Sequence, residues 1–205
     1  MPETTYQRIK GELKTGDIVL FSGKSGFSRT IKYFTTSVWT HVGMVLEVPG
    51  HEGPLVWESL RIGEIEDVVD QRLKSGVQLL SLCERVVRSY DAIAVRQLSH
   101  PVDSAMLDAA LRFRLEVRDR PYEQNVFEVV RAAWDGPFGL NTEDLSSLFC
   151  SELVAASYQR MGLLLPHEDG GAPSNEYTPA YFSRRGRLDL RGKWSLGPEI
   201  LVNAG

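Results

Sequence analysis

Cys150 is the residue with the clearest capacity for chemistry. It follows a Ser-Ser-Leu-Phe stretch and precedes an apolar run at residues 153–158, and this pattern predicts a helix over 150–161 that begins at the cysteine. A thiol in the first turn of a helix lies at the positive end of the helix dipole, beside backbone N–H groups that lack partners. That environment favours the thiolate, which is the nucleophilic form. The sequence therefore predicts a cysteine nucleophile, provided that a histidine reaches it.

A histidine that activates the thiol must come from elsewhere in the chain, together with a polar group that orients its ring. His51, His100 and His167 lie in stretches rich in Gly, Pro or polar residues, which are typical of solvated loops. His41 instead opens an apolar run at residues 41–48 that predicts a strand. A polar ring at the first position of a core strand lies at the end of the sheet, where sites form. A hydrogen-bonded histidine with no catalytic role is the alternative.

Glu58 is the candidate for the orienting group. It lies inside an apolar stretch, residues 55–60, which predicts a further strand. A Gly- and Pro-rich turn at residues 49–54 would pair this strand antiparallel to the one that begins at His41. Glu58 would then approach His41 near the open end of the hairpin. A solvated carboxylate on an edge strand is the alternative.

Composition narrows the possible functions. The chain has 205 residues, of which 42% are apolar and 24% charged, and this favours a single globular domain spanning residues 1–205. The net charge is −4 and no basic block is present, so a nucleic-acid partner is not expected. No apolar stretch is long enough to span a bilayer, and the first residues lack a signal-peptide pattern, so we expect a cytoplasmic protein. The sequence leaves the oligomeric state open.

Cysteine usage and ligand spacing add two further expectations. The two cysteines exclude a disulfide framework, and Cys83 is expected to be a packing residue at the end of a buried strand. The charged stretch at residues 64–67 favours a solvated face over a metal site. No spacing typical of metal ligands, such as C-x-x-C or H-E-x-x-H, is present, so neither a metal nor another cofactor is predicted.

The remaining pattern predicts an α+β fold in which an antiparallel sheet, supplied mainly by the first half of the chain, packs against helices from the second half. Strands are predicted at residues 16–21, 41–48, 55–60, 77–82, 92–98 and 196–202, and helices at 27–34, 101–118, 126–134 and 150–161.

Four short blocks in this order resemble the circularly permuted branch of the NlpC/P60 superfamily of papain-like cysteine hydrolases, and within it the YiiX-like group. The blocks lie at residues 16–21, 39–45, 56–59 and 149–154, and a further similar segment lies at 175–182. In papain the cysteine precedes the histidine. In the permuted branch the histidine strand comes first and the cysteine helix last, as it does here. The resemblance runs from about residue 14 to about residue 182.

The resemblance implies a permuted papain-like fold with the cysteine at a helix N-terminus. It implies that Cys150 is the nucleophile, His41 the general base and Glu58 the orienting residue. It further implies hydrolysis of amide bonds in peptides or peptide-like substrates, including those derived from cell walls, so that the expected partner is a small peptide or amide. Tyr122 and Ser151 are the candidates for substrate binding. For Tyr122, packing under a loop is the alternative.

Two other functions stay open at this point. An acyltransferase or thioesterase that acts on lipid or thioester substrates would use the same three residues. A binding or structural protein could keep the fold without turnover, although it would have no need of a cysteine, a histidine and a glutamate together.

Overall fold

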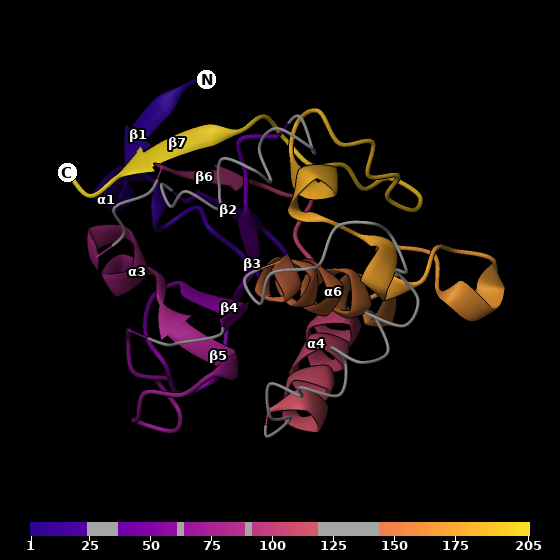
Figure 1. Cartoon of the computed structure of the whole chain (residues 1–205), viewed down its shortest axis with the longest axis horizontal. Coiled ribbons are helices and arrows are strands. Elements are labelled where there is room, and N and C mark those ends of the chain that lie inside the picture. Colours follow the sequence, from indigo (N-terminus) through magenta and orange to yellow (C-terminus); the bar gives the residue numbers. More distant parts are fainter. Residues whose placement is uncertain (24–36, 61–63, 89–91, 119–143) are drawn as a thin grey trace.

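The computed structural model describes residues 1–23, 37–60, 64–88, 92–118 and 144–205, and for residues 144–149 only the helical backbone (Figure 1). Within these ranges the chain forms a mixed sheet with helices on both faces, so the predicted α+β class is confirmed. None of the helices in the described ranges combines the length and the apolar character that crossing a membrane requires.

A seven-stranded sheet in the order β1-β7-β6-β2-β3-β4-β5 forms the centre of the fold. Its strands are β1 (Glu3–Thr5), β2 (Ile18–Ser22), β3 (His41–Leu46), β4 (Leu55–Leu60), β5 (Gly76–Ser81), β6 (Ala92–Arg96) and β7 (Ile200–Asn203). Neighbouring strands are antiparallel except for β1 and β7, which are parallel. The predicted hairpin of β3 and β4 is present, with Met44 opposite Trp57.

Two layers of helix cover the sheet (Figure 1). The helices α4 (Ser104–Val117) and α6 (Asp144–Arg160) pack against each other, and α6 lies on β3 and β4. The short helices α1 (Tyr6–Ile9) and α3 (Leu82–Arg88) contribute to a second apolar cluster. Strand alternation divides the side chains between these layers, since Val42 and Met44 join the cluster that contains α6 while Val45 joins the other. Three 3₁₀ segments follow α6: η1 (His167–Asp169), η2 (Ser174–Glu176) and η3 (Pro179–Phe182).

Within the described ranges the predicted strands and helices are present with shifts of up to a few residues at their ends, and three further differences bear on the site or the sheet. Cys83 is not at the end of a strand, because β5 ends at Ser81 and the half-buried Cys83 lies in α3. The polar start of the chain contains β1, which is held by its pairing with β7 rather than by its own sequence. The helices expected at residues 27–34 and 126–134 lie outside the described residues.

The third difference concerns the start of α6. The helix begins at Asp144 instead of Cys150, so Cys150 lies well inside it. Leu145, Leu148 and Phe149 extend the three- and four-residue spacing of apolar residues, typical of a helix, to positions before Cys150. Asp144 supplies an acidic residue in the first turn, which suits the helix dipole. Inside a helix, a backbone N–H already bonds to the carbonyl one turn earlier. The expectation that Cys150 sits at the helix N-terminus, with its own N–H available to an oxyanion, is therefore wrong.

The turn that leads into β2 depends on Gly16 and Asp17. Gly16 has a φ of +94°, and a Cβ at this position would approach a methyl carbon of Leu98 to 2.5 Å, so the turn requires glycine. The buried Asp17 carboxylate accepts the backbone N–H groups of Lys14 and Leu98, each at 2.9 Å. Burial raises the pKa of Asp17 to about 6, against the opposing effect of these hydrogen bonds.

This raised pKa predicts a pH-dependent contribution to stability. The folded state keeps the Asp17 proton up to about pH 6, whereas an unfolded chain releases it at about pH 3.9. The stabilisation from the bound proton is therefore complete below the unfolded value and is lost as the pH rises to about 6. We expect the free energy of unfolding of the wild type, relative to Asp17→Asn, to fall over this window. Urea denaturation of both proteins at several pH values measures the difference, and a constant difference would contradict the prediction.

Candidate active site

His41 lies between two neighbouring strands that supply its contacts. On β2, Phe21 is its register partner, and the two ring centroids are 5.3 Å apart. On β4, Glu58 Oε2 is 2.5 Å from His41 Nε2. The Glu58 side chain is fully buried, whereas that of His41 keeps 13% exposure. The structure thus brings His41 and Glu58 together as the hairpin predicted.

Gly43 lies beside this pair on β3. A Cβ at Gly43 would lie 2.7 Å from Val56 Cγ2 and 3.2 Å from Glu58 Cβ. Real side chains essentially never come as close as the first of these distances, so a larger residue would displace the Val56 side chain and press on the Cβ of Glu58.

Cys150 approaches the same imidazole from α6. Its side chain is buried in the apolar cluster that α6 forms with the sheet, and it lies close enough to His41 to raise the pKa of the imidazole. Since Glu58 engages Nε2, the nitrogen left for the thiol is Nδ1. His41 is the first residue of β3, so its ring lies at a strand end, where side chains from both faces of the sheet can meet. The three residues predicted as the catalytic set are therefore brought together.

The charges of this cluster favour a protonated imidazole beside an ionised carboxylate. Burial lowers the pKa of His41, but the charges of Cys150 and Glu58, and the hydrogen bonds to both, raise it to about 9 overall. Burial also raises the pKa of Glu58, but Arg85 and then His41 outweigh it, so that this pKa lies below its ordinary value. At neutral pH the imidazolium is thus available as a proton donor and as the counterion of a thiolate.

Arg85 is the member of the cluster that sequence reasoning missed. Its Nε donates to Glu58 Oε1 at 2.9 Å, and its guanidinium lies 4.2 Å from the centroid of the Phe21 ring. It therefore fixes the second carboxylate oxygen while stacking on the ring that contacts His41. The signal that could have found it is helical spacing, because residues 82–88 place charged and apolar side chains at intervals of three and four rather than two.

The structure describes one of the two residues proposed for substrate binding. Ser151 is buried, and its hydroxyl donates to the backbone oxygen of Tyr177 at 2.6 Å. This bond ties α6 to the segment between η2 and η3, and the assignment of Ser151 to substrate binding stays a prediction. Tyr122 lies outside the described residues, and its assignment stays a prediction.

We predict that Glu58→Gln shifts the pH dependence of catalysis. Glutamine can still accept a hydrogen bond from the ring, but it removes a negative charge that raises the pKa of His41. The imidazolium would then lose its proton at lower pH, so the alkaline limb of the kcat/KM profile should move from near pH 9 toward neutrality. Glu84→Gln is the control, since Glu84 is an exposed residue of α3 that pairs with Arg88. An unchanged limb in Glu58→Gln would refute the role given to this carboxylate.

Across the described ranges, no group of three or more His, Cys, Asp and Glu side chains is arranged to hold a metal ion.

Comparison with known proteins gives one family match. A family model described as "Permuted papain-like amidase enzyme, YaeF/YiiX, C92 family" matches residues 12–169. Among solved structures, the crystal structure of the metalloprotein YiiX from Escherichia coli O157:H7 is similar, with a TM-score of 0.48 and 20% sequence identity. The match covers 73% of this chain and 66% of that one, so the chain spans slightly less than two thirds of its length. No curated protein matches.

Proposed function

Because the chain belongs to the permuted papain-like amidase family, as its sequence resemblance implied, we propose that it hydrolyses amide bonds in peptides or peptide-like substrates with Cys150 as the nucleophile. The observation that carries the proposal is that one imidazole, His41, hydrogen-bonds to Glu58 and also interacts with the side chain of Cys150. A base placed between a nucleophile and an orienting group is the arrangement that cysteine catalysis needs.

The proposed reaction has two steps. In the first, the proton of the Cys150 thiol resides on His41, and the thiolate attacks the carbonyl carbon of the substrate. As the tetrahedral intermediate collapses, the C–N bond breaks and His41 gives its proton to the departing amine. A thioester between Cys150 and the acyl group remains.

In the second step, His41 takes a proton from water while the water oxygen attacks the thioester. The C–S bond breaks, the acid is released, and the sulfur regains its proton or stays paired with the imidazolium. Throughout, Glu58 holds the ring through Nε2 and stabilises its positive charge, and Arg85 holds Glu58. Because the pKa of His41 is raised to about 9, the ring is charged at the pH where the amine must leave.

Two matched substrates test the reaction class. The fluorogenic aryl amide of a short peptide and the thioester of the same acyl group are incubated with the protein and with Cys150→Ala. We expect the wild type to hydrolyse the amide and Cys150→Ala to leave it uncleaved. Turnover restricted to the thioester would favour a thioesterase or acyltransferase. Failure to form an acyl-enzyme with an activated ester would overturn the enzymatic proposal and favour a binding protein.

A further inference from the structure

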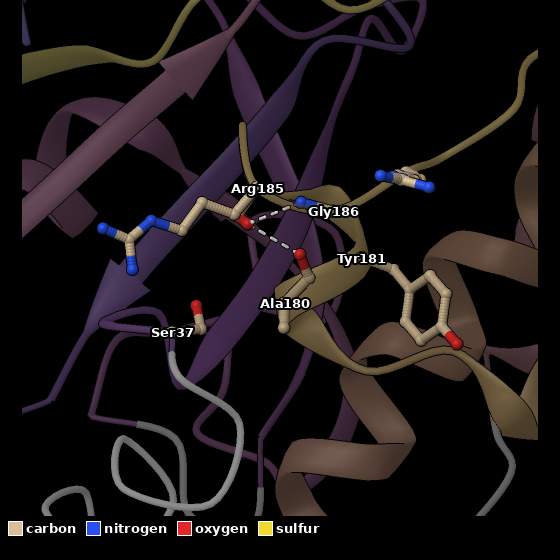
Figure 2. A pocket seen from close by; sticks show the side chains of 7 residues that line it. Ser37, Ala180, Tyr181, Arg185 and Gly186 are labelled. Atoms are coloured by element: carbon tan, nitrogen blue, oxygen red, sulfur yellow. Dashed lines mark hydrogen bonds between the residues drawn. The ribbon is translucent and has the colours of Figure 1, made fainter.

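The residues of the cluster around His41 do not line the pocket drawn in Figure 2, which has a volume of about 240 Å³ and is lined by Ser37 and by residues between 180 and 187. The buried group beside that cluster whose role is still unassigned is the side-chain amide of Gln78, on β5. Gln78 is 1% exposed, and neither its Nε2 nor its Oε1 has a hydrogen-bond partner among the described residues.

Gln78 lies directly beside Glu58. The two residues are register partners on the antiparallel strands β4 and β5, so their side chains leave the same face of the sheet from Cβ atoms about 5 Å apart. Val56 and Leu80, the next register pair on that face, both belong to the second apolar cluster, to which α3 contributes. The Gln78 amide and the Glu58 carboxylate are therefore buried in the same layer.

A buried amide without a partner is costly to the fold. A polar group that leaves water without gaining a hydrogen bond destabilises the folded state, whereas methionine would fill similar space with no polar atom to satisfy. Residues kept at such a cost are typical of functional sites. The position of Gln78 beside a buried charge indicates what the amide does there.

The charge of Glu58 gives the amide a role that an apolar side chain lacks. Both carboxylate oxygens already hold a partner, His41 Nε2 on one and Arg85 Nε on the other. Since no described residue bonds to the Gln78 amide, its dipole orients in the field of the carboxylate, with the N–H edge toward the negative charge. In a buried layer such a dipole stabilises an ion more strongly than it does in water.

Asp67, the other buried carboxylate near β5, has partners of its own. It accepts the backbone N–H of Leu79 at 2.8 Å and forms an ion pair with Lys74 at 3.1 Å. Leu79 follows Gln78 in the chain, and its side chain packs in the opposite layer, in the cluster that contains α6. The carboxylate that shares a layer with the Gln78 amide is thus that of Glu58.

We propose that Gln78 is a positioning residue whose amide dipole stabilises the ionised Glu58 carboxylate in its contact with His41. The inference rests on the proposed function and deepens it, because this carboxylate holds the imidazole in that reaction. Gln78 acts through Glu58 and takes no part in the making or breaking of bonds.

A double-mutant cycle tests the interaction without any need for activity. Gln78→Met and Glu58→Gln are made singly and together, and urea denaturation at neutral pH gives the equilibrium constant for unfolding of each protein. With Glu58 replaced, Gln78→Met should stabilise the fold, because it removes a buried amide that has no partner. With Glu58 ionised, loss of the dipole offsets that gain, so the two effects of Gln78→Met should differ by about threefold or more in this constant.

Leu80→Met is the matched control, since Leu80 lies on the same face of β5 and carries no polar group. Its effect on stability should be the same with Glu58 and with Glu58→Gln. Equal effects of Gln78→Met in the two backgrounds would overturn the proposal. A Gln78→Met protein that fails to fold would overturn it as well, because the proposal predicts little net loss of stability.

The pH profile of amide hydrolysis gives a second readout, which a packing role would not move. Without the amide, Glu58 should take up a proton at higher pH, so the acid limb of the kcat/KM profile should move upward in Gln78→Met and stay in place in Leu80→Met. An unmoved acid limb in Gln78→Met would contradict the role. Coupling in the stability cycle, with no amide cleavage by any form, would refute the proposed function while the action of Gln78 on Glu58 stands.

Discussion

Cys150→Ala is expected to remain folded and to lose turnover by roughly 10⁴-fold or more, as removal of a covalent nucleophile does in other hydrolases. The side chain is fully buried, so loss of the sulfur leaves a small void. Deletion of one atom from such a cluster costs on the order of 1 kcal/mol of stability, which leaves the fold in place. Turnover of the peptide amide and urea denaturation, measured on the same preparations, separate these two effects.

The matched control for this variant is Cys83→Ala. Cys83 is the other thiol of the chain and lies half-buried in α3, so its loss should leave turnover unchanged. Mass spectrometry after reaction with an activated ester should show one added acyl group on the wild type and on Cys83→Ala, and none on Cys150→Ala. If Cys150→Ala kept activity near the wild-type level, Cys150 would not be the nucleophile.

Arg85→Met is expected to lower stability by about 3 kcal/mol, the usual cost of removing one partner from a buried ion pair. Glu58 is fully buried and holds two partners, His41 and Arg85, one on each carboxylate oxygen. Without Arg85, one oxygen of a buried charge loses its donor, and the Phe21 ring loses its cationic neighbour. Urea denaturation at neutral pH measures the loss.

A double-mutant cycle makes this test specific. Glu58→Gln/Arg85→Met removes the charge together with its partner, so the two single effects on stability should not add. Arg85→Lys keeps the charge but lacks the planar fork, and it should recover part of both the stability and kcat. Because Arg85 acts through Glu58, it is a positioning residue, and KM should change less than kcat. The positioning role of Arg85 would be contradicted if Arg85→Met were as stable as the wild type. It would also be contradicted if the effects of Glu58→Gln and Arg85→Met on stability added in the double variant.

Much of this fold follows from local sequence patterns. Short apolar runs bounded by glycine and proline predicted β2, β3 and β4, and three- and four-residue periodicity predicted α4. Two residues of the candidate site could also be predicted, because His41 and Glu58 are polar residues in otherwise apolar strands. Burial of a polar side chain costs free energy unless a partner bonds to it, so such residues are expected to pair.

Other features depend on tertiary contacts that no local pattern contains. The apolar run of residues 79–82 suits a strand, so the turn into α3 at Leu82 and the placement of Arg85 over Glu58 were missed. The strand β1 exists only because β7 pairs with it. At α6, two serines ahead of Cys150 resembled a helix start, but stronger signals for a start lie further upstream at Asp144.

Gly43 carries a consequence for how this site is recognised and altered. It contributes no functional group, yet it leaves room beside the Cβ of the acid that holds His41. A survey of the reactive centre that considers only acids, bases and nucleophiles would pass over it. One methyl group added at this position would press on Val56 and on the Cβ of Glu58, with every chemically active residue still present.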